Sequence, residues 1–228
     1  MENSRNIEFI LLHSTKYGER SLVLHTLSRE YGRCSLFLRS ATSGGKASGG
    51  KSRTANLLSP LNIIEASVPG GNSKGSLITV NGLTTAYPLT GLRSDLYKSS
   101  ISIFIAELLF RALKDGANEA GLYDWCVQKI LLLDAIEGNF SNFHLLFTLE
   151  LSAAMGFRPE YRNIEDFVEL PHRGIVREIL SLPFSEAMLL PMNGSVRSAI
   201  VESLIRYLET HLEYPLNIRS TAILKEIM

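Results

Sequence analysis

The chain has 228 residues, of which 45% are hydrophobic and 20% are charged, and this composition excludes a largely disordered protein. Its length allows one large domain or two small ones. The longest apolar run, Ile101–Phe110, is interrupted by Glu107 and falls short of the ~20 residues that a membrane-spanning helix needs. Because the N-terminus also lacks the charged-then-apolar pattern of a signal peptide, we expect a cytoplasmic protein that does not enter a membrane.

The net charge of zero conceals an uneven distribution of charge along the chain. Residues 1–80 carry ten cations and five anions, whereas the other 148 residues carry 13 cations and 18 anions. Such asymmetry is typical of a polyanion-binding segment joined to a part with a different task. The two cysteines, Cys34 and Cys126, are far apart in sequence, which favours a reducing compartment over a secreted disulfide scaffold.

The first third of the chain predicts short β-strands separated by Gly, Ser and Asn clusters. Cys34, Leu36 and Leu38 alternate with more polar neighbours, which is the period-2 pattern of a half-buried strand. A turn is expected at Lys16–Glu19. The expected strands are Ile7–His13, Ser21–Ser28, Arg33–Ser40, Leu61–Val68 and Leu77–Leu83. Five short strands in about 80 residues favour a five-stranded OB-fold barrel.

The pattern changes after a linker at Thr84–Gly91, and longer apolar periodicity predicts helices. Asp95 is a candidate N-cap for the first helix, and Gly156 is a candidate C-cap for the third. The expected helices cover residues 95–114, 119–136, 142–155, 195–213 and 219–228. We therefore predict an α+β protein, with an OB-fold domain at residues 1–86 and a mainly helical domain at 87–228 that contains an irregular segment at 160–192.

Gly45–Ser52 matches the P-loop pattern G-x-x-x-x-G-K-[ST]. A genuine P-loop would use Lys51 to bind nucleotide phosphates and Ser52 to ligate magnesium. However, a P-loop opens directly into a helix, and here Pro60 allows only about two helical turns. Asp134, which imitates a magnesium-orienting carboxylate, lies in a helical pattern. A P-loop NTPase is therefore the alternative hypothesis.

The same Gly/Ser-rich loop fits a second role, which is to follow a nucleic-acid backbone. Small residues allow close approach of the loop, while its cations neutralise phosphates without reading bases. Arg33 and Arg39 are six residues apart on one strand and therefore share a face. The predicted DNA-binding set is Lys16, Arg20, Arg33, Arg39, Lys46, Lys51 and Arg53. Tyr17, Tyr31 and Phe37 offer rings for base stacking; the alternative is that they pack in the core or in turns, which is the favoured role for Phe37.

Neither a metal site nor a catalytic site is predicted from the sequence, and no cofactor is expected. Two separate cysteines and five histidines do not form the paired ligand spacings of structural zinc sites. His13 and His25 could meet across two strands, where we expect hydrogen-bonded histidines and not metal ligands. Glu165, Asp166 and Glu169 fit a solvated loop. We therefore expect a protein that is not an enzyme.

The order of several segments resembles the RecO family of bacterial recombination mediators. No single segment is diagnostic, but the resemblance covers most of residues 7–160 and returns weakly in the C-terminal tail. It rests on Thr15–Glu19, Glu30–Arg33, the basic Gly/Ser loop, Leu58–Leu61, Ile105–Leu109, Phe143 and Leu149–Pro159. The resemblance implies an N-terminal OB-fold followed by a helical domain, in agreement with the pattern of elements.

The resemblance also implies a function in DNA repair at the nucleoid. It implies binding of single- and double-stranded DNA, annealing of complementary strands, and contact with single-strand-binding protein and RecR. The role would be to help RecA load onto coated single strands. Many RecO proteins carry a four-cysteine zinc site after the segment that corresponds to Gly156–Pro159, but this chain has no cysteine beyond Cys126. Apolar burial of residues such as Phe167, Val168, Ile175, Ile179 and Leu180 would then have to hold residues 160–192.

A partner site for the tail of single-strand-binding protein requires an apolar pocket flanked by cations. Arg111, Lys114 and Lys129, near the first two expected helices, are the candidates. Surface charges that complete helix faces are the simpler explanation for each of them taken alone. A third hypothesis is an adaptor whose basic face binds acidic proteins and not DNA.

Overall fold

The computed structural model describes residues 4–19, 21–39, 56–69, 78–117 and 121–227. The chain divides into two compact units. The barrel unit comprises residues up to Leu89 together with Leu113–Gln128, and the helical unit comprises Thr90–Ala112 and the residues from Lys129 onward. The single boundary after residue 86 stays a prediction.

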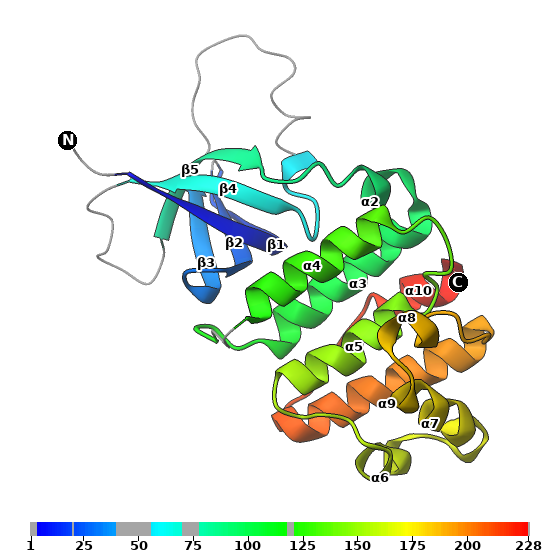
Figure 1. Cartoon of the computed structure of the whole chain (residues 1–228). Helices are drawn as coiled ribbons and strands as arrows, with labels where there is room; N and C mark the ends of the chain where they lie inside the picture. The colour runs from blue at the N-terminus through cyan, green and yellow to red at the C-terminus, as the bar shows by residue number, and fades with distance from the viewer. Residues whose placement is uncertain (1–3, 20, 40–55, 70–77, 118–120, 228) are drawn as a thin grey trace. The chain divides into compact units, whose positions relative to one another are not determined.

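Five strands of the barrel unit close into a barrel (Figure 1). They are β1 (Arg5–Tyr17), β2 (Ser21–Ser28), β3 (Gly32–Arg39), β4 (Ile63–Val68) and β5 (Ile78–Thr85). The strand order is β1-β2-β3-β5-β4, in which β3 and β5 are parallel and the other pairs are antiparallel. The predicted α+β class with an N-terminal OB-fold barrel is confirmed.

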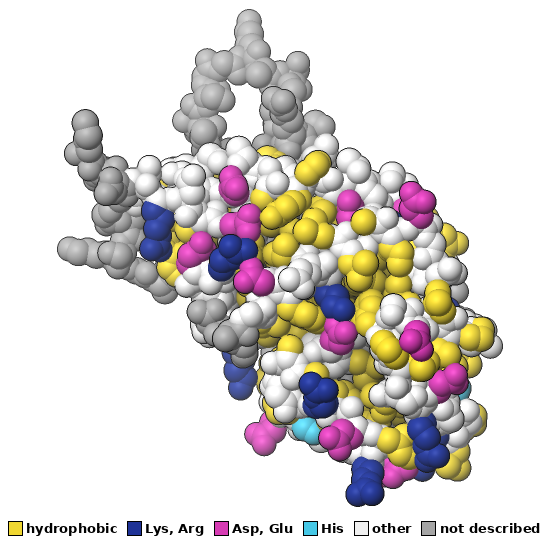
Figure 2. All heavy atoms as spheres, in the orientation of Figure 1, with side chains coloured by type: hydrophobic (Ala, Val, Ile, Leu, Met, Phe, Trp, Pro, Cys, Tyr) yellow, Lys and Arg dark blue, Asp and Glu magenta, His cyan; other side chains and the backbone are white. Residues whose placement is uncertain are grey.

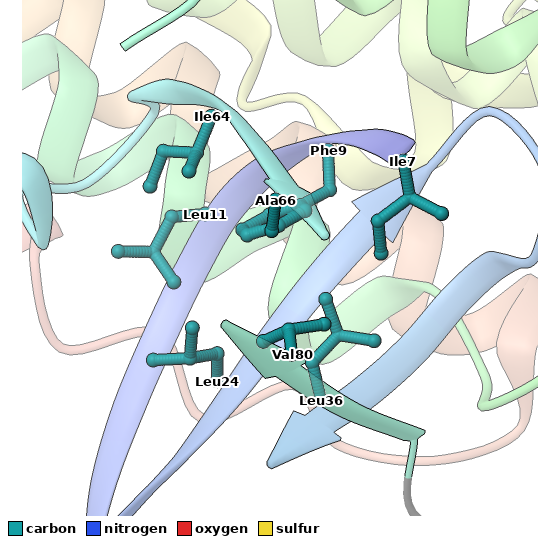
Figure 3. Close-up of a cluster of buried hydrophobic side chains, with 8 residues drawn as sticks. All are labelled: Ile7, Phe9, Leu11, Leu24, Leu36, Ile64, Ala66 and Val80. Carbon is teal, nitrogen blue, oxygen red and sulfur yellow. The ribbon is translucent and has the colours of Figure 1, made fainter. Parts of the chain in front are cut away.

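Alternate residues of the strands fill the barrel with a single apolar cluster (Figure 3). Its fully buried members are no more than 2% exposed: Ile7, Phe9, Leu11, Leu24, Leu36, Ile64, Ala66 and Val80. Cys34 and Leu38 pack against this cluster from β3, as the alternation predicted. Burial of each large apolar side chain contributes about 1.5–3 kcal/mol, so the cluster fixes which face of each strand turns outward.

Several strand boundaries differ from the sequence-based expectation, and two of these differences have a clear conformational cause. β1 continues to Tyr17, so that Lys16 and Tyr17 belong to the strand, and the chain reverses at Gly18 with a φ of 67°. β4 begins only at Ile63, because Leu61 has a φ of 61° in the left-handed region, which is incompatible with an extended strand.

Residues 113–128 join the barrel unit through hydrogen bonds to two strands. The Gly116 N–H donates to the Arg33 carbonyl oxygen at 2.7 Å, and the Arg33 N–H donates to the Ala117 carbonyl oxygen at 2.8 Å. The Tyr123 hydroxyl donates to a Glu8 carboxylate oxygen at 2.8 Å. This segment therefore completes the barrel unit from a distant part of the sequence.

The helical unit is built mainly from long, apolar helices. Phe104, Phe143, Phe147 and Tyr207 are its largest fully buried side chains. Its main elements are α2 (Thr90–Ser94), α3 (Leu96–Ala112), the second half of α4 (Leu122–Ala135), α5 (Phe143–Ala154), α9 (Gly194–Leu212) and α10 (Thr221–Ile227). Helices α5 and α9 lie side by side (Figure 1), and α10 packs on α3 and α9.

Two predicted helix caps are present in the helical unit. The Asp95 carboxylate accepts a hydrogen bond from the Lys98 N–H at 3.0 Å at the start of α3. Gly156 follows α5 with a φ of 88°, the left-handed conformation in which glycine ends many helices. Among the described residues, no helix is long and apolar enough to cross a membrane.

The segment that lacked a clear prediction, residues 160–192, forms five short elements. Val168 and Ile179 are buried at 4% exposure, while the Arg206 side chain donates to the Phe167 carbonyl oxygen at 2.9 Å and Arg173 donates to the Val168 carbonyl oxygen at 3.2 Å. The elements are α6 (Tyr161–Ile164), the 3-10 turns η1 (Glu165–Phe167) and η2 (Leu170–His172), α7 (Arg173–Ser181) and α8 (Phe184–Ala187). Apolar burial and side-chain bonds to the backbone therefore hold this segment together.

Candidate nucleic-acid interface

The outward face of β1, β2 and β3 places aromatic, polar and basic side chains in adjacent rows. Side chains alternate between the two faces of a strand, so the residues opposite those of the core cluster point outward. Three rows cross the sheet, and each contains one residue from β1, one from β2 and one from β3. The first row is Tyr17, Ser21 and Arg39, the second is Thr15, Val23 and Phe37, and the third is His13, His25 and Ser35. None of these outward residues is acidic.

Tyr17 and Phe37 form an aromatic pair on this face. Their ring centroids are 5.8 Å apart and the rings are inclined by 85°, which is the edge-to-face arrangement that aromatic quadrupoles favour. Tyr17 is 62% exposed, and Phe37 is half-buried. Phe37 thus points away from the barrel core and packs against Tyr17 near the turn that follows β1, so of the two expected kinds of packing, core or turn, it does not show the first.

His13 and His25 stack on each other in the next row of the same face. Their ring centroids are 5.9 Å apart and nearly parallel, at 14°. His25 is hydrogen-bonded to the Ser35 hydroxyl at 3.1 Å and to the Thr15 hydroxyl at 3.4 Å. Burial lowers the pKa of His25, and the charge of Arg33 and the neighbouring His13 lower it further. The two histidines therefore meet across β1 and β2, and His25 is hydrogen-bonded as expected, with a lowered pKa.

The predicted cations of this region occupy different environments. Lys16 and Arg39 are exposed near the ends of β1 and β3. Arg33 shares the outward face with Arg39, as its spacing predicted, but it is only 4% exposed. Its guanidinium lies 3.2 Å from the Asp115 carboxylate and donates to the Cys34 carbonyl oxygen at 3.2 Å. Arg33 is therefore a structural anchor for residues 115–117 and is not available to a phosphate, which corrects its predicted role.

Four further cations of the predicted set, Arg20, Lys46, Lys51 and Arg53, lie outside the described residues. The P-loop match at Gly45–Ser52 lies there too. Asp134, the second part of the NTPase hypothesis, is within α4, where its carboxylate accepts a hydrogen bond from the Leu92 N–H at 2.8 Å. This carboxylate therefore stabilises the start of the helical unit.

A different side of the barrel carries mixed charge. Glu8 of β1 lies directly opposite Glu65 of β4 in the strand register, and Arg29 lies 3.8 Å from Glu8 and 2.7 Å from Asp124. Figure 2 shows acidic and basic side chains intermixed on the viewed side of the barrel. Two opposed carboxylates repel a polyanion, so the three rows of outward residues at 13–17, 21–25 and 35–39, called the outward face of β1–β3 below, are the better candidate for a nucleic acid.

The three cations predicted to bind a protein partner are distributed over both units. Arg111 is exposed on α3, and Lys114 is exposed in the barrel unit. Lys129 is 15% exposed, lies 2.6 Å from a Glu150 carboxylate oxygen, and sits 3.6 Å from the centre of the Phe184 ring. Its charge is thus engaged within the helical unit.

Glu150 and Phe184 also line an open groove of about 550 Å³ in the helical unit, which sequence patterns did not reveal. It is lined mostly by apolar side chains from α5, α7 and α8, together with Arg158 and Arg177. The two acidic side chains of the groove have internal partners, because Glu150 is paired with Lys129 and Glu160 caps α6. The sequence feature that could have indicated this groove is Arg158, the basic residue that directly follows Gly156 and Phe157 at the end of α5.

The described part of the chain contains no candidate metal-binding site. No group of three or more His, Cys, Asp or Glu side chains is placed there to hold a metal ion. Cys126 is buried, and burial raises the pKa of its thiol well above the usual range. Cys34 is half-buried, and burial raises the pKa of its thiol as well. Neither thiol is poised to act as a thiolate ligand or nucleophile.

Comparison with known proteins agrees with this architecture. Residues 1–88 match the family described as recombination protein O, N terminal, and residues 93–163 match recombination protein O, C terminal. The chain belongs to the RecO family. Its role is therefore in DNA repair and recombination.

Relatives named DNA repair protein RecO match most of the chain. The one from Azobacteroides pseudotrichonymphae is 28% identical over 96% of both chains, and the one from Bacteroides fragilis is 26% identical over 96% of both. The one from Phocaeicola vulgatus is 35% identical over 70% of this chain and 63% of its own. The RecO resemblance inferred from segment order is thus confirmed.

Proposed function

We propose that this RecO-family protein binds single- and double-stranded DNA through the outward face of β1–β3. The observation that carries the proposal is the row of that face that contains exposed Tyr17 and exposed Arg39, with no acidic residue in the three rows. Lys16, which pairs with Leu22 and so alternates away from that face, is exposed beside Tyr17 at the end of β1. Lys16 and Arg39 would bind phosphates, and the OB-fold binds oligonucleotides with the corresponding strands.

The remaining predicted cations extend this proposed surface along the chain. In the sequence, Arg20 stands between β1 and β2, and Lys46, Lys51 and Arg53 stand between β3 and residue 56, all outside the described residues. With about six phosphate contacts in all, affinity for DNA would fall by orders of magnitude between low and moderate salt, because each contact releases condensed counterions.

The proposed activity is annealing of complementary strands, which needs no bond-breaking chemistry. A cationic surface offsets the repulsion between two approaching phosphate backbones. We propose that the protein acts in this way at the chromosome, together with single-strand-binding protein and RecR, and so helps RecA load onto coated strands. On this proposal the protein is not an enzyme. ATP hydrolysis that disappears in Lys51→Ala would favour the NTPase alternative instead.

Annealing of complementary oligonucleotides coated with single-strand-binding protein tests the proposal. The wild-type protein is expected to accelerate annealing, and the double variant Lys16→Glu/Arg39→Glu is expected to slow it at least about tenfold, because two phosphate contacts become repulsive. Arg162→Glu, which reverses an exposed charge on α6, is the matched control and should anneal at the wild-type rate. Equal rates for the double variant and the control would refute the assignment of this face.

We propose that the groove of the helical unit, with Arg158 and Arg177, receives the tail of single-strand-binding protein. A mostly apolar lining that includes two arginines is suited to an acidic peptide with an apolar end. Lys129 contributes by holding Glu150 and Phe184 in the groove lining, whereas roles for Arg111 and Lys114 stay predictions.

The groove proposal predicts a separation of the two binding functions. Arg158→Ala/Arg177→Ala should weaken binding of the tail peptide about tenfold or more, since charge-assisted contacts are each worth ~1.5–3 kcal/mol. Affinity for bare oligonucleotides should remain unchanged. Fluorescence anisotropy with a labelled tail peptide and a labelled oligonucleotide measures both, and a loss confined to the oligonucleotide would contradict the proposal.

A further inference from the structure

We infer that the aromatic rings of Tyr17, Phe37, His13 and His25 form a base-stacking platform that gives this protein a preference for single-stranded over duplex DNA. This inference rests on the proposed DNA-binding face and adds to it the residues that determine specificity. The inference is based on two ring pairs, the edge-to-face pair Tyr17–Phe37 and the stacked pair His13–His25. These four rings are called the platform.

The platform is continuous because its rings come from neighbouring rows of one strand face. Tyr17 and His13 belong to β1, His25 to β2 and Phe37 to β3. The register places residue 17 in the first row, Phe37 in the second, and His13 beside His25 in the third. Exposed Thr15 lies between the two ring pairs on β1 and holds His25 through its hydroxyl.

Exposure distinguishes the platform from ordinary packing. A single exposed aromatic residue needs no explanation, but a row of rings on one face of a barrel is unusual for a solvated surface. Tyr17 is 62% exposed and His13 is exposed, while each of them lies against a half-buried ring, Phe37 or His25. The half-buried rings therefore support the exposed ones, which present their outer surfaces to a ligand.

Tyr31, the third aromatic residue considered for stacking, has a different environment. It packs against the core cluster of the barrel, and the Arg5 guanidinium lies 5.0 Å from its ring centre. Both surroundings occupy its surface, so Tyr31 is excluded from the platform.

The spacing of the rows suits an extended single strand. Outward residues on one strand are two positions apart, which corresponds to about 6.6 Å along the strand. Paired bases in a duplex follow one another at ~3.4 Å and are turned inward, so their faces cannot reach a ring on a protein surface. Unpaired bases can separate and stack on such rings in any sequence, because every base has a π face.

Charge and stacking then make separable contributions on this surface. Lys16 and Arg39 contact phosphates, which both forms of DNA present, whereas the platform contacts bases that only a single strand exposes. Tyr17→Ala is therefore expected to weaken single-strand affinity about 5- to 150-fold, which corresponds to the ~1–3 kcal/mol of one base–aromatic stack. Duplex affinity should change less than about twofold, and the salt dependence of both should be unchanged.

Matched variants control for folding and for the chemistry of the ring. Tyr17→Phe and Tyr17→Trp retain a ring and should keep single-strand affinity near the wild-type value. Tyr87→Ala removes another exposed tyrosine of the barrel unit, 37% exposed and located after β5, and should have no effect. A weakening by Tyr87→Ala equal to that of Tyr17→Ala, or failure of Tyr17→Phe to preserve affinity, would overturn the inference.

An abasic oligonucleotide provides the decisive comparison because it keeps the phosphates and lacks the bases. Wild-type protein and Tyr17→Ala should bind an abasic strand with equal affinity, so that the difference between them appears only with normal bases. If the wild-type protein binds neither form of DNA, the proposed function fails. If it binds both and Tyr17→Ala weakens abasic, normal and duplex binding equally, the DNA-binding face stands and the platform inference is overturned.

Discussion

Replacement of Asn142 by leucine is expected to lower the free energy of unfolding of the helical unit by about 3–5 kcal/mol. The Asn142 amide nitrogen donates to the carbonyl oxygens of Met188 and Leu190 at 3.1 and 2.9 Å, and lies 3.3 Å from that of Ala187. Its oxygen accepts a hydrogen bond from Arg197 at 3.0 Å. Asn142 is 2% exposed and Arg197 is 7% exposed, so water cannot replace the lost partners.

The expected loss is large because one side chain satisfies several buried polar groups at once. Leucine has a similar volume but leaves these carbonyl groups and a guanidinium with fewer partners, and each such group costs about 1–3 kcal/mol or more. Urea unfolding followed by far-ultraviolet circular dichroism measures the change. Asn193→Ala, which removes the exposed cap that accepts the Val196 N–H at 2.9 Å, should cost only about 1 kcal/mol. Similar losses for the two variants would contradict this account of residues 187–192.

Acidification is expected to destabilise the helical unit through His144. Burial lowers the pKa of His144 to about 3, and the positive charge of Arg197 acts in the same direction. In the unfolded chain the pKa of a histidine is about 6.5. The unfolded form therefore binds a proton between these two values and the folded form does not. Stability is fully retained above pH ~6.5 and falls as the pH decreases, by about 2 kcal/mol between pH 7 and pH 5.

The variant His144→Gln isolates this contribution, since glutamine does not titrate. The free energy of unfolding of the variant is expected to change less with pH over this range. Below pH 6, the change in this free energy per pH unit should be larger in the wild type than in the variant by nearly ~1.4 kcal/mol. Phe104→Leu serves as the control, because the Phe104 ring packs edge-on against His144 at 5.8 Å. It should lower stability at every pH while it keeps the wild-type slope. A wild-type slope in His144→Gln would show that the histidine does not cause the pH dependence.

Much of the fold could be predicted because its signals are local. The alternation of Cys34, Leu36 and Leu38 identified the inward face of β3, and Asp95 marked the start of α3. These features depend on neighbours within a few residues. The five short elements of residues 160–192 were not predicted, because their stability comes from side chains distant in sequence, such as Asn142 and Arg206.

The candidate site was predicted less completely for the same physical reason. The outward position of Arg33 followed from strand alternation, but its burial depends on Asp115, 82 positions later in the chain. The aromatic pair of Tyr17 and Phe37 joins two strands whose register is set by the whole barrel. Spacing within a strand assigns a face, whereas pairing across strands and coverage by distant segments decide which side chains remain available.

The most direct test of the DNA-binding face is the salt dependence of single-strand binding. The logarithm of the affinity of the wild-type protein should fall linearly with the logarithm of the salt concentration, with a slope of about −0.7 for each neutralised phosphate. Lys16→Ala/Arg39→Ala should reduce the magnitude of that slope by about 1.4, whereas Arg162→Ala should leave it unchanged. A slope in the double variant equal to that of the wild type would contradict the proposal that the outward face of β1–β3 holds the DNA.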